Sequence, residues 1–183
     1  AFNTVEGGIA YFSNDKQLRQ FTAMTNFGIN GGVTDQLGFN GKLSELHAAV
    51  GLLGLKHFSQ RVIERSKVWS YYDEFFFDIH TVETTVIPHG VALNYAYYPV
   101  KIVDRNIDLD EVTRKLAAKD IIARKYFSEL LTEMPFFKDS LTIGTLDNAT
   151  ASSNRILCLP IHESYVPYKE FIANEVLAAL KYT

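Results

Sequence analysis

The sequence is poor in cysteine, since Cys158 is the only one among 183 residues. A single thiol excludes an intrachain disulfide and any paired-cysteine metal site. The five histidines show neither the HExxH spacing nor a similar ligand pattern, so we expect no metal site. Phosphate-binding P-loops, dinucleotide fingerprints and GxSxG elbows are also absent. This use of cysteine is typical of a reducing compartment and predicts a cytoplasmic protein.

The chain also lacks an excess of charge of one sign. Its 18 lysines and arginines and 21 aspartates and glutamates are interspersed and give a formal net charge of −3. This balance argues against a nucleic-acid groove and a polybasic membrane patch. No stretch reaches the roughly 18 uninterrupted apolar residues of a membrane span, and the first residues lack the pattern of a secretory signal. We therefore expect small-molecule or protein partners, and neither nucleic acid nor membrane.

The first part of the chain combines a glycine-rich loop with the start of a long helix. Residues 8–12 are predicted as a short buried strand, followed by a helical turn over 16–22. Five glycines within 26–41 predict a loop without regular structure, shaped for close backbone approach. From Leu43 the pattern is helical, and residues 46–55 carry apolar groups on nearly every face, which predicts a helix buried all round.

The remaining residues predict a mixture of strands and helices. Further along the long helix, apolar side chains recur on one face only, at Phe58, Val62, Trp69, Tyr72 and Phe76. A turn at 88–90 precedes predicted strands over 93–103, 121–123 and 156–161, the last stopped by Pro160. Predicted helices cover 108–119, 128–132 and 169–182, with a capping box between Asp108 and Glu111, and 140–153 is a predicted loop. This order indicates an α+β unit.

Two short segments are candidate sites. Asn40 lies between glycines just before the long helix, where an asparagine can simply cap the helix or can offer its amide to a phosphate. The run Arg124-Lys125-Tyr126-Phe127 mixes hydrogen-bond donors with aromatic rings after a predicted strand. That mixture suits an anionic ligand, and it suits an ordinary solvated strand end equally well.

Several motifs occur in an order that resembles one enzyme family. They are Phe2-x-Thr4-x-Glu6-Gly7-Gly8, Asn26-Phe27-Gly28, the run from Gly38-Phe39-Asn40-Gly41-Lys42 to Leu52, Ala123 to Phe127, and Leu159-Pro160-Ile161-His162. Together they resemble the sugar aminotransferases of the DegT/StrS type, which depend on pyridoxal phosphate. The resemblance covers nearly the whole chain.

The resemblance implies an α/β protein with the fold-type-I architecture of pyridoxal-phosphate transferases. Residues 1–60 would be the C-terminal edge of the large cofactor domain, with an interface loop and the start of the long helix. Residues 61–183 would be the small α+β C-terminal domain. In the family pattern the Schiff-base lysine directly precedes the segment that begins at Ala1, so we expect no catalytic residue within this chain.

The implied reaction moves an amino group from glutamate, which leaves as 2-oxoglutarate, to a nucleotide-linked keto-deoxysugar such as a dTDP-4-keto-6-deoxyhexose. Deoxysugar and polysaccharide biosynthesis are the family's usual settings. One alternative is a sugar dehydratase of the same fold, in which histidine replaces the Schiff-base lysine. A second alternative is a regulatory or scaffold relative without catalysis.

The family also implies a homodimer with active sites between the subunits. Asn40 matches the loop asparagine that reaches the partner's cofactor phosphate. Lys42 stands where the family usually has arginine, which keeps the charge but loses the planar fork. Arg124 and Tyr126 match the region that lines the sugar-nucleotide pocket. We therefore predict cofactor binding by Asn40 and substrate binding by Lys42, Arg124 and Tyr126.

Overall fold

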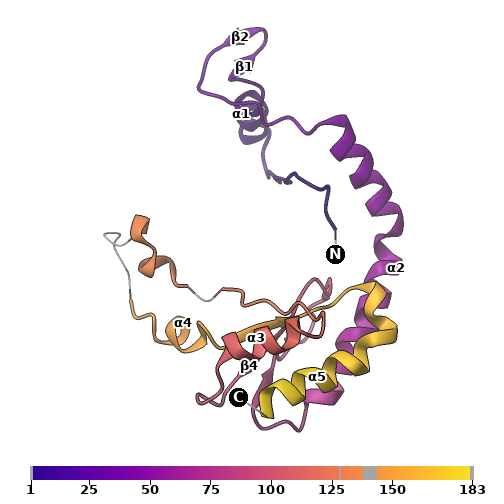
Figure 1. The fold of residues 1–183 in the computed structure, drawn as a ribbon. Coiled ribbons are helices and arrows are strands. Elements are labelled where there is room, and N and C mark those ends of the chain that lie inside the picture. The colour runs from indigo at the N-terminus through magenta and orange to yellow at the C-terminus, as the bar shows by residue number, and fades with distance from the viewer. Residues whose placement is uncertain (1, 128, 138–143, 182–183) are drawn as a thin grey trace. The chain divides into compact units, whose positions relative to one another are not determined.

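The computed structural model describes residues 2–127, 129–137 and 144–181. The chain divides into two compact units, residues 2–59 and residues 60–183, which are described separately (Figure 1). The helix α2 (Glu45–Phe76) contributes residues to both units.

The unit of residues 2–59 contains one short helix and a small hairpin. Helix α1 (Asp15–Thr25) is capped by Asn14, whose side chain accepts a hydrogen bond from the amide of Gln17 at 2.9 Å. Strands β1 (Ile29–Asn30) and β2 (Val33–Thr34) pair antiparallel. Their two-residue turn, Gly31 and Gly32, has positive φ at both positions, as tight hairpins of this kind require. The expectation of no regular structure over 26–41 was therefore wrong for this hairpin.

The segment of residues 8–12 is not the buried strand that its sequence predicts. It belongs to no strand, and the side chains of Ile9 and Tyr11 are 89% and 92% exposed. A strand needs a neighbour for its backbone hydrogen bonds and a surface for its apolar face. No described strand pairs with this segment. Its apolar cover is limited to the Phe12 ring, which packs against Phe21 of α1 with the ring centroids 5.0 Å apart.

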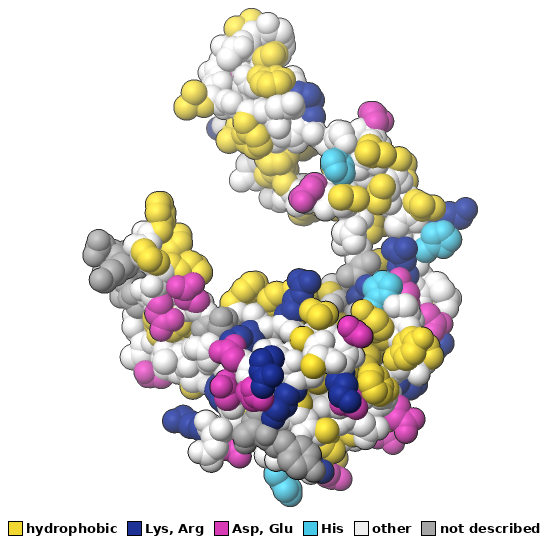
Figure 2. Space-filling model, in the orientation of Figure 1, with side chains coloured by type: hydrophobic (Ala, Val, Ile, Leu, Met, Phe, Trp, Pro, Cys, Tyr) yellow, Lys and Arg dark blue, Asp and Glu magenta, His cyan; other side chains and the backbone are white. Residues whose placement is uncertain are grey.

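Helix α2 differs between its two halves. In the first half, residues 2–4 lie against Gly51 and Gly54. Other faces of this half are exposed, and apolar side chains gather there (Figure 2); they belong to Leu46, Leu52, Leu53 and Leu55. The predicted burial of 46–55 on every face is therefore not found in this chain by itself. The second half buries one face, as its spacing predicts, through Val68, Trp69, Tyr72 and Phe76. The one-sided spacing of apolar residues in the second half therefore predicted burial better than the all-round apolar composition of the first half. A helix with one apolar face needs packing partners on that face only.

A three-stranded antiparallel sheet forms the centre of the unit of residues 60–183. Its strands are β3 (Val82–Thr84), β4 (Tyr98–Ile102) and β5 (Ile156–Leu159), in the order β3-β4-β5. The central pairing puts Val100 opposite both Thr84 and Leu157. The prediction for 156–161 holds, with Pro160 ending the strand, whereas the prediction for 93–103 was too long.

Helices α3 (Leu109–Ala117) and α5 (Lys169–Lys181) lie where the sequence predicts them, and the prediction for 128–132 overlaps only a 3₁₀ turn. The other described helical elements are α4 (Asp147–Ser152) and three 3₁₀ turns, η1 (Leu131–Glu133), η2 (Pro135–Phe137) and η3 (Glu163–Tyr168). The expected turn at 88–90 is present. Helix α4 occupies part of the predicted loop 140–153. Residues 128, 138–143 and 182 lie outside the described part of the chain, although predictions fell on them.

Two details of the predicted elements are wrong. Asp108 caps α3, but its side chain accepts from the amide of Asp110 at 2.9 Å, while Glu111 pairs with Arg114 instead of closing a capping box. Residues 121–123 form no strand. Instead, Arg124 alone pairs with Cys158 in an isolated antiparallel bridge beside β5.

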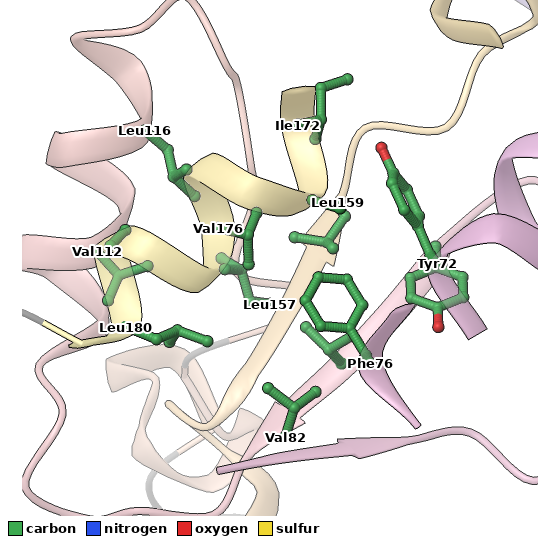
Figure 3. Packing of buried hydrophobic residues seen from close by; sticks show 14 of the residues in the cluster. Tyr72, Phe76, Val82, Val112, Leu116, Leu157, Leu159, Ile172, Val176 and Leu180 are labelled. Carbon is green, nitrogen blue, oxygen red and sulfur yellow. The ribbon is translucent and has the colours of Figure 1, made fainter. Parts of the chain in front are cut away.

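The hydrophobic core lies where α2, the sheet, α3 and α5 meet. Figure 3 shows Phe76 of α2 close to Leu157 of β5 and Val176 of α5. The polar groups of two aromatic residues in this core donate hydrogen bonds to the Asp73 carboxylate. The Tyr98 hydroxyl and the Trp69 indole nitrogen each lie 2.8 Å from an Asp73 oxygen. Burial, reinforced by the bond to Asp73, raises the pKa of Tyr98 far above its usual range. The phenol therefore stays neutral and keeps donating to Asp73.

Candidate functional site

In the unit of residues 2–59, backbone hydrogen bonds fix the position of Asn40. Asn40 pairs with Asn26 in an isolated antiparallel bridge. The residues on either side are also tied to the end of α1: the amide of Phe39 donates to the Met24 carbonyl and the amide of Gly41 donates to the Thr25 carbonyl, both at 2.8 Å. The backbone at Asn40 is thus held against a helix end.

Two glycines allow this arrangement by removing side chains where the loop crosses itself. A Cβ at Gly28 would lie 1.8 Å from the Gln36 carbonyl oxygen, and a Cβ at Gly38 would lie 2.0 Å from the Gly28 amide nitrogen. Both contacts are with backbone, which cannot move aside. The predicted close approach is therefore real, and the loop makes it with itself.

The side chain of Asn40 is exposed, and among the described residues it has no hydrogen-bond partner. It does not cap α2. Ser44 does so, because its hydroxyl accepts from the amide of His47 at 3.3 Å and contacts the His47 Nδ1 at 2.7 Å. The capping interpretation of Asn40 is thus wrong, and its carboxamide remains available to a ligand.

Lys42 is held by the same two residues that begin the loop. Its ammonium nitrogen lies 3.4 Å from the Asn26 Oδ1 and 4.1 Å from the centroid of the Phe27 ring. Amide oxygens and ring faces both attract a cation. Asn40 and Lys42 are therefore anchored to one dipeptide, Asn26-Phe27, the first through its backbone and the second through its side chain.

In the unit of residues 60–183, the two other predicted residues contact each other. The Nη1 of Arg124 donates to the Tyr126 hydroxyl at 2.8 Å, and the Tyr126 ring meets the Tyr97 ring edge-on, with centroids 5.5 Å apart. The backbone of Arg124 is fixed to Cys158 by two hydrogen bonds, of 3.0 and 2.8 Å. These residues line a shallow pocket with Pro160 and Ile161.

The one thiol in this pocket, that of Cys158, is buried. Burial raises the pKa of Cys158, so the sulfur stays protonated near neutral pH. The chemistry that the pocket offers is a guanidinium beside aromatic rings, and the described residues use only one of its donors. This combination binds phosphate groups and stacks on planar ligands.

The sequence did not single out Phe27 and Tyr97 as functional residues. Tyr97 belongs to a tyrosine-rich segment before β4, which was interpreted only as strand. Phe27 was part of a family motif without a role of its own. Within the described residues no group of three or more potential metal ligands occurs. The described helices include none with the length and apolar character to cross a membrane.

Comparison with known proteins identifies the class to which this chain belongs. The model of the DegT/DnrJ/EryC1/StrS aminotransferase family matches residues 1–176, and the chain is a member of this family. A dTDP-4-amino-4,6-dideoxy-D-glucose transaminase of Escherichia coli is 32% identical over 163 residues, which are 86% of this chain and 43% of that enzyme. The chain thus spans less than half the length of this relative.

Solved structures confirm the predicted α/β fold of fold-type-I transferases. DesI, determined in the presence of its TDP-sugar product, matches 88% of this chain and 42% of its own with a TM-score of 0.75 and 25% identity. NtdA from Bacillus subtilis, with bound cofactor PMP, matches 92% of this chain and 40% of its own with a TM-score of 0.75 and 18% identity. The second likeness concerns the fold alone.

Proposed function

We propose that this chain, with the rest of its polypeptide, forms an aminotransferase that moves the amino group of glutamate to a nucleotide-linked keto-deoxysugar. A dTDP-4-keto-6-deoxyhexose is the proposed acceptor. The observation that carries the proposal is the 32% identity to the Escherichia coli transaminase across 86% of the chain. Residues 1–60 would then be the C-terminal edge of the cofactor domain and residues 61–183 the small domain.

Pyridoxal 5'-phosphate is the proposed cofactor, and it supplies the electron sink for amino transfer when bound. The side-chain carboxamide of Asn40 suits the phosphate of this cofactor. The exposed carboxamide of Asn40 has no partner in the described part of the chain and offers two N–H donors, and its backbone is held against the end of α1. We assign this contact to the cofactor of the partner subunit in a homodimer.

The exposed leucines of α2 support the homodimer. Leu46, Leu52, Leu53 and Leu55 lie within ten residues of one helix, and residues 2–9 form an apolar groove with Leu43, Leu52 and Leu55. A contiguous apolar surface of this kind marks a protein interface. The proposed occupants are the remainder of the cofactor domain and the partner subunit.

Lys42, Arg124 and Tyr126 are the proposed substrate-binding residues. Arg124 keeps guanidinium donors beyond the one used by Tyr126, and these suit the oxygens of a diphosphate. Tyr126 orients the guanidinium through its hydroxyl and offers a ring edge to the substrate. Lys42, in the unit of residues 2–59, is a separate proposed contact for an anionic group of the substrate.

The reaction is tested with the purified complete polypeptide, glutamate and dTDP-4-keto-6-deoxyglucose. Mass spectrometry should detect an amino sugar nucleotide and an equal amount of 2-oxoglutarate. Arg124→Ala should raise the KM for the sugar nucleotide more than it lowers kcat. Loss of a sugar hydroxyl without amine incorporation would instead identify the dehydratase, and no turnover with cofactor bound would favour the scaffold relative.

Asn40 is tested by cofactor titration of the apo protein. A hydrogen bond to a charged acceptor contributes about 1.5–3 kcal/mol, so Asn40→Ala should weaken cofactor affinity roughly tenfold to a hundredfold. Ser44→Ala is the matched control, because it removes the helix cap. It should lower the apo unfolding midpoint while affecting cofactor affinity less than Asn40→Ala does. Equal cofactor affinity of wild type and Asn40→Ala would end the phosphate role.

A further inference from the structure

We propose that Asn26 and Phe27 form a seat that positions the Lys42 ammonium for a phosphate group of the ligand. The inference rests on the proposed function and adds two positioning residues to it. The seat consists of the Asn26 Oδ1, 3.4 Å from the lysine nitrogen, and the Phe27 ring, whose centroid lies 4.1 Å from it. Neither residue is expected to touch substrate or cofactor.

The backbone at Phe27 explains how one dipeptide supplies both contacts. Phe27 has φ of +60°, in the left-handed region that bulky residues rarely adopt. Hydrogen bonds hold this conformation on both sides: the Phe27 amide donates to the Phe39 carbonyl at 3.1 Å, and the Gly28 amide donates to the Ala23 carbonyl at 2.8 Å. With the backbone turned in this way, the ring of Phe27 and the amide of Asn26 face the same ammonium.

The chemistry of the seat suits a cation that must later meet an anion. An amide oxygen and the face of an aromatic ring attract an ammonium without neutralising its charge. Within the described residues, no carboxylate lies within ion-pairing distance of Lys42. Several other cations of the chain are paired with carboxylates, such as Lys67 with Glu64 and Lys101 with Glu83. Lys42 is thus restrained while its full charge remains available.

Restraint matters because a free lysine side chain has many conformers. Ordering it costs conformational entropy at the moment of binding, and a seat that has already ordered it removes part of that cost. The same loop holds the Asn40 backbone through its bridge to Asn26. The cofactor phosphate and the substrate diphosphate share the chemistry that Lys42 recognises, and separate titrations distinguish these two sources.

The test uses the complete polypeptide and three variants: Phe27→Leu, which removes the ring, Phe27→Tyr, which keeps it, and Lys42→Met, which removes the charge. Calorimetry measures thymidine diphosphate binding to the holoprotein and pyridoxal phosphate binding to the apoprotein. Phe27→Leu should weaken one of these two affinities about two- to fivefold, which corresponds to an exposed cation–π contact. Phe27→Tyr should retain the wild-type affinity. In the Lys42→Met background, Phe27→Leu should cause no further loss.

A second readout detects the seat without any ligand. NMR of the protein labelled at the lysine ε-carbon should give a ring-shifted Lys42 signal, assigned by its absence in Lys42→Met. The shift should vanish in Phe27→Leu and persist in Phe27→Tyr. Lack of a shift in the wild type would overturn the seat itself. Equal losses from Phe27→Leu with and without Lys42 would overturn positioning through the lysine. If the wild type shows the ring-shifted signal but Lys42→Met binds both ligands as tightly as the wild type does, Lys42 does not bind a phosphate. The proposal that the seat positions Lys42 for a phosphate would then be refuted.

Discussion

The two units of this chain differ in how they are held together. The unit of residues 60–183 buries a contiguous cluster of aliphatic and aromatic side chains from α2, the sheet, α3 and α5 (Figure 3). In the unit of residues 2–59, Ala23 is the only buried apolar side chain among those described. The unit of residues 60–183 therefore has a core of its own. The unit of residues 2–59 is held together mainly by backbone hydrogen bonds at the base of its loop.

This difference matches the roles proposed for the two units. Loops that bind ligands between protein surfaces need exposed polar groups on a fixed backbone, and backbone pairing provides this without a large core. Many apolar side chains of residues 2–59 are exposed in this chain. We therefore expect these side chains to be covered by other protein surfaces.

The largest effect should come from breaking the core of residues 60–183. Phe76 is 1% exposed, and truncation of a buried phenylalanine costs about 3–5 kcal/mol. Phe76→Ala should lower the unfolding free energy by this amount, measured by urea denaturation and followed by the fluorescence of Trp69, the only tryptophan. The adjacent Phe77 is 81% exposed, so Phe77→Ala should change it by less than about 0.5 kcal/mol. Similar losses in both variants would contradict the packing described here.

An intermediate effect should appear at alkaline pH and only in this core. The pKa of Tyr98 is raised by burial and by its bond to Asp73, so the unfolded chain loses the phenol proton at about pH 10 while the folded chain keeps it. Stability is then full below pH 10 and falls as the pH rises further, by about 1.4 kcal/mol per pH unit for this group. Tyr98→Phe should remove that part of the slope in denaturation series between pH 9 and 11. An unchanged slope would mean that Tyr98 ionises equally in both states.

The sequence predicted those elements whose signals are local. Asp108 precedes a helix, Pro160 ends a strand, and the spacing of Trp69, Tyr72 and Phe76 marks a buried face. Strand β3 (Val82–Thr84) was missed because three residues are too few to show an alternating pattern. Residues 8–12 were predicted as a strand because their composition reflects burial that the described residues do not supply.

The candidate site was only partly predictable for a similar reason. Asn40 and Arg124 could be proposed from motifs, since each lies within a run of characteristic residues. The seat of Lys42 depends on the left-handed backbone of Phe27 and on pairing between distant segments, neither of which has a signature in one sequence. Tyr97 joins Tyr126 only through the bridge that brings Arg124 to Cys158.

The smallest effect on stability is expected at the exposed leucines in the first half of α2. These side chains contrast with the buried ones in the second half of the same helix. Leu52 is 70% exposed, so Leu52→Asp should change the unfolding free energy of the 183-residue chain by less than about 0.5 kcal/mol. In the complete polypeptide the same substitution should shift the monomer–dimer equilibrium strongly, because it buries an unpaired charge in the proposed interface. Analytical ultracentrifugation at several concentrations measures this shift. Val86→Asp is the matched control, since Val86 is 88% exposed and lies outside α2, and it should leave association unchanged. If Leu52→Asp dimerises as the wild type does, the leucines of α2 do not form the subunit interface, and their cover must come from the same polypeptide.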